Sequence, residues 1–355
     1  MPKTCIVLAL LGALLGCGPR LRLAPPPAVF PTTTSWLSQL DHALDGPLAS
    51  DGARVFLTTR DGSLRAVDLA TGTALWRVRN RAGALAARPG VLVVAAPDGT
   101  VWAVDPASGS ARWKSASGVE GRLAPVFAGD RVLVLGKGLA ALDLATGKLL
   151  WAVAEVTSAV APALGADRLY VAAEAGVLRC HSLADGATIW VKKTGFPSLG
   201  VPLAVDGRVY LAAGERAFAA FDAKSGKRRW RWTVGAGARF EPAVLGGNVL
   251  FVTLEGLLYG LNKHNGHLSF RTSLPSRPAS GPLLLGSAAL VAAHGTRARE
   301  SLLVTLDGRN GQRLGDLRTI TELATSPVLI GRTLLLGLRD KDAVSALLLG
   351  AADQP

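Results

Sequence analysis

The sequence predicts an all-β protein, an eight-bladed β-propeller of four-stranded antiparallel blades, and three observations lead to this prediction. The stretch AVDLATGTALW at 66–76 returns as AVDPASGSARW at 103–113 and as ALDLATGKLLW at 141–151. Further copies follow with a period of about 40 residues, which is typical of propeller blades. No segment shows a sustained 3.6-residue periodicity with helix caps, so almost no helix is expected.

The repeated pattern is Asp or Asn (Ser in one copy), a Gly four residues later and an aromatic residue after another four. Its copies are Asp68, Gly72 and Trp76; Asp105, Gly109 and Trp113; Asp143, Gly147 and Trp151; Ser182, Gly186 and Trp190; Asp222, Gly226 and Trp230; and Asn262, Gly266 and Phe270. A worn seventh copy has Asp307 and Gly311, but Gly315 stands where the aromatic residue is expected. The first positions are 37, 38, 39, 40, 40 and 45 residues apart.

Each position of this pattern has a physical role in a strand–turn–strand unit. The Asp or Asn side chain accepts hydrogen bonds from turn amides, and Gly tolerates a positive φ. The aromatic residue begins the outer strand, where a tryptophan can bury about 150–250 Å² against a neighbour. Blade one illustrates the unit, with strands predicted in GPLAS, RVFLTT, GSLRAVDL and ALWRVR. The repeated aromatic is therefore expected to set the packing between successive blades.

Eight units carry the three inner strands, but only seven are followed by a fourth strand. Seven of the eight have a proline near their start: Pro47, Pro125, Pro162, Pro202, Pro242, Pro282 and Pro327. The second unit lacks the proline but has ALAARPGVLVVAA in register, and the last unit, AVSALLLG, ends at 350 without a fourth strand. Trp36 lies 11 residues before Pro47, as Trp151 lies before Pro162. We therefore expect an N-terminal strand around Trp36 to complete blade eight and close the ring, which removes exposed sheet edges.

The N-terminal residues predict export followed by a tether. Residues 1–16 place Lys3 before an apolar run of 11 residues, which is too short to span a bilayer and typical of a cleaved signal peptide. The segment LLGC resembles the bacterial lipoprotein box, which implies lipidation of Cys17 and, with Gly18 next, anchoring in the outer membrane facing the periplasm. Residues 17–35 are then an extended tether, 36–350 the propeller and 351–355 a C-terminal tail. Plain secretion with a chance cysteine is the alternative.

The repeats resemble the PQQ-like β-propeller repeat of bacterial quinoproteins and their non-enzymatic relatives, over Trp36 to Gly350. With a lipoprotein box and a short tether, the chain most resembles the BamB family of outer-membrane protein assembly factors. This resemblance implies no enzyme activity, no cofactor and no metal, and a scaffold role in the β-barrel assembly machinery. The implied partners are POTRA domains of a BamA-like protein and other components of the machinery, bound by a monomeric propeller. The alternatives are an envelope propeller that binds another protein or a polysaccharide, and a quinone-dependent dehydrogenase.

Three loops are candidate partner contacts. The loop KKTGFPSLGVP at 192–202 resembles the BamB loop that helps to contact BamA, which implies contacts through Phe196 and Leu199; the alternative is that both residues only pack the loop. Two loops between second and third strands are longer than the others, at 293–301 and 338–345. Both belong to the face that also carries the fourth-to-first connections. Their charged residues are Arg297, Arg299, Arg339 and Lys341. The alternative is that sequence drift in the last two blades accounts for the extra length of these loops.

The net charge of +13 comes largely from the predicted outer strands. The basic residues there are Arg77, Arg79, Arg81, Arg112, Lys114, Lys192, Lys193, Arg228, Arg229, Arg231 and Arg271. They either guard the strand edges against pairing or attract acidic protein surfaces or anionic lipids. Nucleic acid is not expected for an exported protein without a stacking platform.

Histidine and cysteine side chains offer no convincing catalytic site. His264 and His267 in HNGH lie at a predicted turn, with no third metal ligand nearby in the sequence. His181 replaces an apolar strand residue and is expected to be buried or interfacial. Cys180 takes a position that is otherwise small, for example Ala66 and Ala103, and is expected to be a buried, inert thiol.

Overall fold

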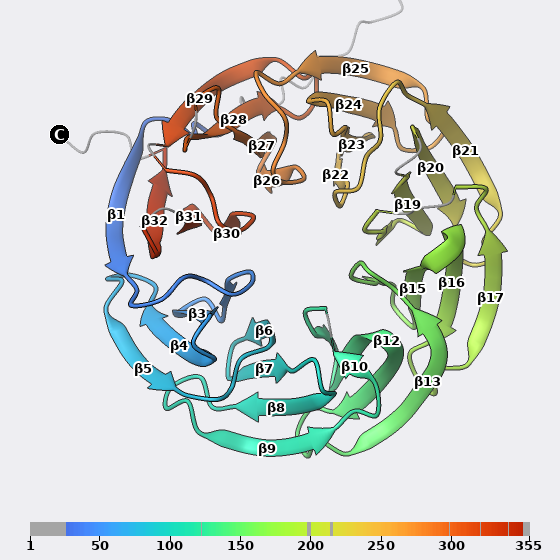
Figure 1. Ribbon diagram of the computed structural model, residues 1–355. Helices are drawn as coiled ribbons and strands as arrows, with labels where there is room; N and C mark the ends of the chain where they lie inside the picture. Colours follow the sequence, from blue (N-terminus) through green and yellow to red (C-terminus); the bar gives the residue numbers. More distant parts are fainter. Residues whose placement is uncertain are drawn as a thin grey trace, which may run out of the picture.

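The computed structural model describes residues 26–121, 123–196, 200–213, 216–297, 299–319, 321–339 and 341–350. Its strands form eight four-stranded antiparallel sheets arranged as blades around a central axis (Figure 1). One short 3-10 turn, η1 (Glu174–Gly176), is the single helical element among these residues. The predicted fold, an eight-bladed β-propeller with almost no helix, is therefore confirmed.

In most blades the strands run outward from the axis in chain order. Blades one to four contain β2 (Ala49–Ser50), β3 (Arg54–Thr59), β4 (Ser63–Asp68) and β5 (Ala74–Val78); β6 (Ala84–Arg88), β7 (Val91–Ala95), β8 (Thr100–Val104) and β9 (Ala111–Ala116); β10 (Glu120–Gly121), β11 (Val126–Ala128), β12 (Arg131–Asp143) and β13 (Leu149–Thr157); and β14 (Ala163–Leu164), β15 (Arg168–Ala173), β16 (Val177–Ser182) and β17 (Thr188–Lys193). In blade three the long strand β12 pairs with β10, β11 and β13.

Blades five to eight repeat this order, except that the last blade takes its outer strand from the other end of the chain. They contain β18 (Leu203–Val205), β19 (Arg208–Ala213), β20 (Ala217–Asp222) and β21 (Arg228–Thr233); β22 (Ala243–Leu245), β23 (Asn248–Val252), β24 (Leu257–Asn262) and β25 (Leu268–Ser273); β26 (Leu283–Leu285), β27 (Ala288–His294), β28 (Ser301–Asp307) and β29 (Arg313–Thr319); and β30 (Val328–Ile330), β31 (Thr333–Leu338), β32 (Ala343–Leu349) and β1 (Thr32–Gln39). The pairing of β1 with β32 runs from Thr32 opposite Leu349 to Gln39 opposite Ala343. The predicted closure of the ring by an N-terminal strand is thus confirmed.

The hydrophobic core lies mainly between neighbouring blades, and the repeated aromatic residues seal its outer part. Trp36 covers Gly72 of the next turn, where an added Cβ would lie 2.5 Å from its ring. The indole Nε1–H of Trp36 donates to the carbonyl oxygen of Leu69 at 2.8 Å. Five further tryptophans donate in the same way at 2.9–3.3 Å, to Pro106, Leu144, Leu183, Ala223 and Lys263. Six of the eight interfaces therefore combine apolar burial with one directional hydrogen bond, whereas Phe270 covers Gly311 of blade seven without such a bond.

The interface between blades seven and eight is built differently, because Gly315 has no side chain to cover the next blade. The ring of Phe30 lies there, and a Cβ added to Gly315 would approach its Cδ2 atom to 2.8 Å. Val29 is 3% exposed and belongs to the core between these blades. The ordered fold therefore begins before the predicted boundary at 36, and the segment 29–35 is not a free tether. Its physical role is to fill the space that the missing aromatic leaves.

Candidate protein-binding face

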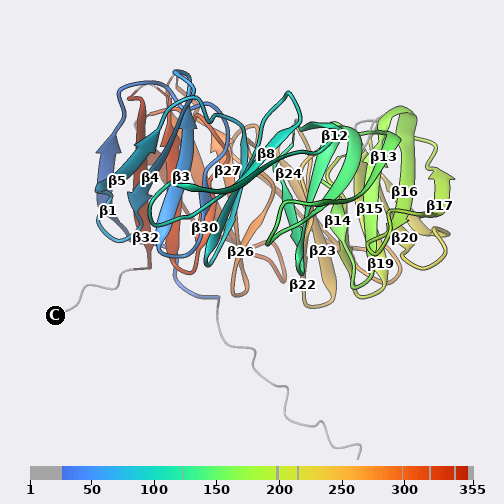
Figure 2. The same ribbon diagram turned by 90° about the horizontal axis from the view of Figure 1, so that it is seen from below.

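The ring has two unequal faces, distinguished by their loops. The turns between first and second strands and between third and fourth strands lie on one face, which we call the terminus face. Pro27 lies 3.1 Å from a Cβ added at Gly286, in such a turn, and the Gly350 amide donates to the carbonyl oxygen of Val29 at 2.8 Å. Both ends of the described chain therefore meet the ring at this face (Figure 2). The other face, which we call the loop face, carries the connections between blades and the second-to-third-strand loops.

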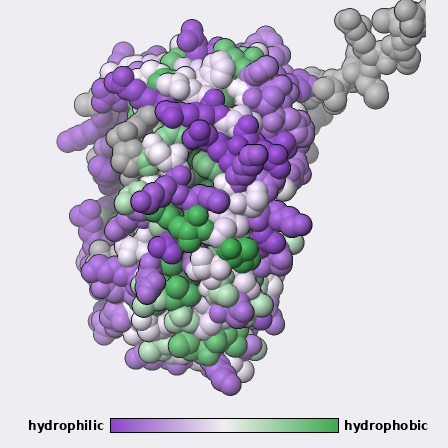
Figure 3. Space-filling model, turned by 90° about the vertical axis from the view of Figure 1, so that its right-hand side faces the viewer, coloured by the Kyte–Doolittle hydropathy of each residue, from purple (hydrophilic) through white to green (hydrophobic). Residues whose placement is uncertain are grey.

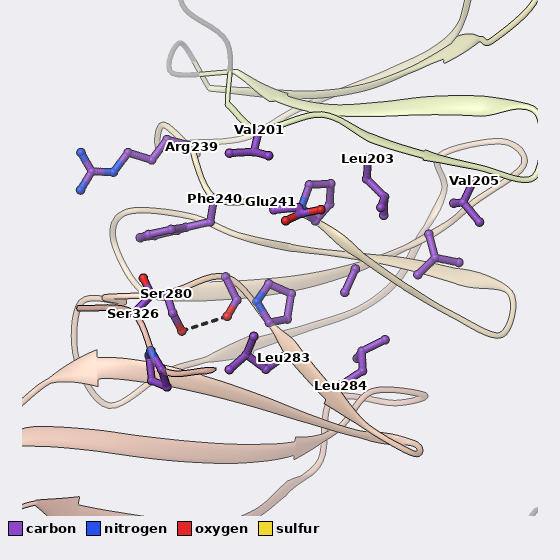
Figure 4. A pocket seen from close by; sticks show the side chains of 16 residues that line it. Val201, Leu203, Val205, Arg239, Phe240, Glu241, Ser280, Leu283, Leu284 and Ser326 are labelled. Atoms are coloured by element: carbon purple, nitrogen blue, oxygen red, sulfur yellow. Dashed lines mark hydrogen bonds between the residues drawn. The ribbon is translucent and has the colours of Figure 1, made fainter. Parts of the chain in front are cut away.

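A cavity of about 660 Å³ opens on the axis of the ring beside blades five to eight. Its walls are the first strands β18, β22 and β26 together with the connections that enter them from the loop face (Figure 4). Most of the wall is apolar: Val201, Leu203, Val205, Pro242, Val244, Pro282, Leu283, Leu284 and Pro327. The volume lies in the range of ligand and side-chain binding pockets. An apolar partner side chain would lose water on entering it.

Polar groups collect at the mouth of this cavity. Glu241 makes no hydrogen bond or ion pair with the described residues, and desolvation raises the pKa of its carboxyl group. Figure 4 shows its carboxylate among the lining residues, whereas Arg239 extends away from it, with its guanidinium 5.6 Å from the centroid of the Phe240 ring. Ser280 is already engaged, because its hydroxyl donates to Gly281 O at 2.9 Å and accepts from Ala292 N at 3.0 Å. The mouth therefore offers one unpaired acidic group above apolar walls.

Sequence reasoning did not identify Glu241, although the sequence contained a signal for it. The residue before the blade-starting proline is small or apolar in most units, as at Gly46, Ala124, Ala161 and Val201. Glu241 is the one charged residue at this position. The Glu241 side chain is exposed at the cavity mouth, and a charged group that interrupts a repeated apolar position there is a reason to consider it for function.

The predicted contact residue Phe196 lies inside the molecule. Its side chain is 2% exposed and packs in the core cluster that contains Ala172 and Cys180. The guanidinium of Arg231 stands 4.9 Å from the centroid of its ring. For Phe196 the geometry thus agrees with the packing alternative, since the ring is not presented to a partner. Leu199, the other predicted contact of this loop, lies outside the described residues.

The four predicted basic contacts lie on the loop face, in blades seven and eight. Arg297, Arg299, Arg339 and Lys341 are all exposed. Arg299 has a positive φ of 65°, and the Gly295 amide donates to Glu300 O at 2.8 Å, which closes the base of the loop. Arg339 approaches Glu322, with 3.8 Å between Nη1 and Oε1. None of the four lines the axial cavity, so the loop face has a basic region at one side and an acidic group near the axis.

The remaining titratable candidates lie in turns or in the core. Cys180 is fully buried, and burial raises the pKa of its thiol to about 11, which keeps it protonated and unreactive. His264 is exposed in its turn, with its Nδ1 atom 3.1 Å from Nη1 of Arg208. Among the described residues, no group of three or more His, Cys, Asp or Glu side chains is arranged to hold a metal ion.

His181 is fully buried, and its Nδ1 atom lies 3.0 Å from Gly186 O and 3.4 Å from Thr188 Oγ1. Because a carbonyl oxygen only accepts, Nδ1 carries the proton of the neutral ring. The Nε2 atom is buried without a partner, so a second proton there would be poorly solvated. Burial therefore lowers the pKa of His181 below its ordinary value of 6.5.

A buried neutral histidine makes stability fall as the pH decreases. Below pH 6.5 the unfolded chain binds a proton at His181 more readily than the folded chain does. The stabilising contribution of the neutral, buried ring is therefore fully present only above pH 6.5. Between about pH 7.5 and pH 5.5 we expect His181 to lower the free energy of unfolding by up to about 1.4 kcal/mol. Urea unfolding at both pH values, for wild type and His181→Leu, measures the difference. The free energy of unfolding of His181→Leu should lose this part of its dependence on pH, whereas that of His267→Ala should keep it. An equal dependence on pH in all three proteins would contradict the assignment.

The described residues contain no helix that is long and apolar enough to cross a membrane. The fold, the repeated turns and the axial cavity together define a PQQ-like β-propeller. The model of the family described as outer membrane protein assembly factor BamB matches residues 28–154 and 137–349. The chain therefore belongs to the BamB family.

Solved structures with the same fold include a BamB protein, a designed protein and an alcohol dehydrogenase. BamB from Moraxella catarrhalis is 19% identical, with a TM-score of 0.72 over 91% of this chain and 99% of that one. The computationally designed Ika8 protein is 16% identical, with a TM-score of 0.70 over 87% and 97% of the two chains. Quinohemoprotein alcohol dehydrogenase from Comamonas testosteroni is 13% identical, with a TM-score of 0.69 over 91% and 77%. At these identities the likeness is one of fold. No curated protein matches the sequence significantly.

Proposed function

We propose that this protein is a non-enzymatic scaffold lipoprotein of the outer-membrane β-barrel assembly machinery, and that its loop face docks to POTRA domains of a BamA-like partner. The observation that carries the proposal is the combination of BamB family membership with the meeting of both chain ends at the terminus face. An anchor attached there leaves the whole loop face directed away from the attachment point. A fold alone does not define a function, so the loop face supplies the specific contacts.

The anchor in this proposal is a lipidated Cys17, exposed after removal of residues 1–16 as a signal peptide. Cys17 is nine residues from Pro26, the first described residue. Nine extended residues span at most about 30 Å. The terminus face would then lie close to the periplasmic surface of the outer membrane. Several acyl chains on one cysteine would make this attachment durable.

The charges on the loop face favour a protein partner whose surface carries both acidic and basic side chains. Arg297, Arg299, Arg339 and Lys341 would meet acidic side chains, and Glu241 would meet a lysine or arginine whose stem enters the apolar cavity. Exposed rim charges chiefly steer association. A pair formed at Glu241 would be partly desolvated, and its loss would mainly speed dissociation. Glu241 is therefore the more sensitive position in this proposal.

The test is affinity purification of the full-length protein from native outer membranes in mild detergent, with mass spectrometry of the proteins recovered. We expect a BamA-like protein and companion lipoproteins with wild type. Glu241→Arg, and Arg297→Glu combined with Arg299→Glu, should each reduce their recovery about tenfold or more. Lys227→Glu is the matched control, because Lys227 is exposed in a turn of the terminus face, and it should leave recovery unchanged.

Three other results would each contradict a part of the proposal. Recovery of the protein alone, or with polysaccharide-export components, would contradict a role in barrel assembly and favour a general envelope-binding propeller. Quinone-dependent reduction of a dye with an alcohol or sugar as substrate would contradict the non-enzymatic assignment. Equal loss of recovery in Lys227→Glu and Glu241→Arg would show that the loop face is not the docking surface.

A further inference from the structure

The outer strands of blades three and four differ from those of most other blades in their exposed residues. On the outer strands, the residue directly after the repeated aromatic projects from the opposite face of the strand, and the residue directly before it is the extra residue of a β-bulge. The residue after the aromatic is basic in blades one, two, five and six: Arg77, Lys114, Arg231 and Arg271. In blades three and four, both positions are apolar: Leu150 and Ala152 around Trp151, and Ile189 and Val191 around Trp190. Basic residues are therefore missing next to the repeated aromatic in two adjacent blades, and β13 of blade three has none along its whole length.

These residues form an exposed apolar surface, which we call the rim patch and define as Leu149, Leu150, Ala152, Ile189 and Val191. Leu149 and Leu150 are each 41% exposed, Ile189 is 42% and Val191 is 43% exposed, and Ala152 is also exposed. Figure 3 shows green apolar areas on the lower half of this side of the ring, below a mostly purple upper half. Burial of such a patch by a partner would be favourable.

The rim patch lies on both sides of the edge of β13. Trp151 faces blade four, since a Cβ added at Gly186 would lie 2.6 Å from its ring, so the next residue, Ala152, faces blade two. Leu150 is the extra residue of a β-bulge in β13 and is exposed at the edge. Trp190 faces blade five, where its ring lies 2.8 Å from a Cβ added at Gly226, so Val191 faces back toward β13, and Ile189 lies at the corresponding bulge of β17. A strand placed along this edge would have apolar neighbours on both of its faces.

The edge itself is available for backbone hydrogen bonds. Among the described residues, β13 pairs with β12 and with no strand on its outer side. It is nine residues long, and its sequence LLWAVAEVT contains no basic residue. An exposed strand edge presents a row of N–H and C=O groups to any extended chain that fits it.

We propose that the outer edge of β13 and the rim patch bind an extended segment of a partner protein, which adds to blade three as a fifth strand. The segment is uncharged and rich in small apolar residues where it contacts the patch, with acidic groups at its ends. The charges at the site are Lys148 before β13, Lys192 and Lys193 on β17 and the exposed Glu155 within β13, so the basic groups outnumber the acidic one and favour acidic ends on the segment. A second copy of this chain fits less well, because it would bring the same lysines and a second net charge of +13 to the contact.

The rim patch is separate from the loop face, so this proposal does not rest on docking to POTRA domains. The probe is a nine-residue fluorescent peptide of alternating valine and threonine with a glutamate at each end. Its control is the same peptide with alternate backbone amides N-methylated, which removes donors without changing the side chains. Fluorescence anisotropy with the full chain should show saturable binding of the first peptide and at least about tenfold weaker binding of the second.

The protein variants locate the site. Leu150→Lys and Ala152→Lys each place a cation at the edge of β13 and should weaken peptide binding at least about tenfold. The matched control is Ser269→Lys, because exposed Ser269 precedes Phe270 on β25 as Leu150 precedes Trp151. It should bind as wild type does. Thermal unfolding of each variant separates loss of binding from loss of fold.

Four outcomes would overturn the proposal. Equal binding of the N-methylated peptide would mean that the patch adheres without strand pairing. Equal weakening by Ser269→Lys would mean that the effect is one of net charge. A wild-type dimer in sedimentation that Leu150→Lys dissociates would assign the edge to a second copy. Binding to phosphatidylglycerol vesicles that Leu150→Lys abolishes would assign the patch to a lipid surface.

Discussion

Replacing Trp230 by alanine is expected to lower the free energy of unfolding by about 3–5 kcal/mol, the usual cost of removing a large buried aromatic side chain. Trp230 is 7% exposed, and its ring packs against Tyr210 and Phe251 with centroids 6.1 and 6.5 Å away. It also covers Gly266 of the next turn, and its Nε1–H donates to Lys263 O at 3.2 Å. The substitution therefore opens a cavity between blades five and six and removes one of the two donors to Lys263 O, the other being the Tyr210 hydroxyl at 3.1 Å.

Urea unfolding followed by far-ultraviolet circular dichroism measures this loss without depending on tryptophan fluorescence. The control is Trp102→Ala, because Trp102 is half-buried and outside the repeat, with Lys114 5.7 Å from its ring centroid. It should cost only about 1 kcal/mol, as surface changes usually do. Gly266→Ala should behave like Trp230→Ala, because Gly266 has a φ of +75° and its added Cβ would lie 2.7 Å from the Trp230 ring. Equal losses at Trp230 and Trp102 would contradict the structural role of the repeat.

The sequence predicted the number of blades and the closure of the ring, because both depend on local spacing. A turn aspartate, a turn glycine and an aromatic residue lie within nine consecutive residues, so each copy can be recognised without its neighbours. The same residue spacing showed that the last unit lacks a fourth strand. It also showed that Trp36 lies as far before Pro47 as Trp151, the aromatic residue of an outer strand, lies before Pro162 of the next blade. The number of blades and the closure of the ring therefore follow from residue spacing along the sequence and from the two-residue period of strands.

The parts that sequence reasoning missed depend on contacts between distant residues. Nothing near Gly315 indicates that Phe30 fills the space of its missing side chain, because the two residues come from opposite ends of the chain. Phe196 belongs to a loop that looked exposed, yet it is buried beside Cys180 and under Arg231. The axial cavity arises only when the first strands of blades five, six and seven and the connection into blade eight surround it. Predicting such features requires the assembled ring.

Removal of all residues before Leu40 is expected to abolish the stable fold, while moving β1 to the other end of the chain is expected to restore it. Deletion removes seven paired positions between β1 and β32, the buried ring of Trp36 and its hydrogen bond to Leu69 O. Loss of the tryptophan alone costs about 3–5 kcal/mol. That is a large part of the usual total stability of about 5–15 kcal/mol. The exposed edge of β32 would in addition promote aggregation.

A circular permutant distinguishes ring closure from a mere need for more residues. Its chain starts at Leu40, continues to Gly350, and then enters residues 32–39 through a five-residue turn like those that follow Asp68 or Asp143. The turn is feasible because Thr32 lies opposite Leu349, as the two strands of a hairpin do. Thermal unfolding and light scattering should show an aggregating or molten truncated protein, but a monomeric, cooperatively unfolding permutant. A truncated chain as stable as the full chain would mean that seven blades and an open edge suffice, and that β1 is an appendage rather than the strand that closes the ring.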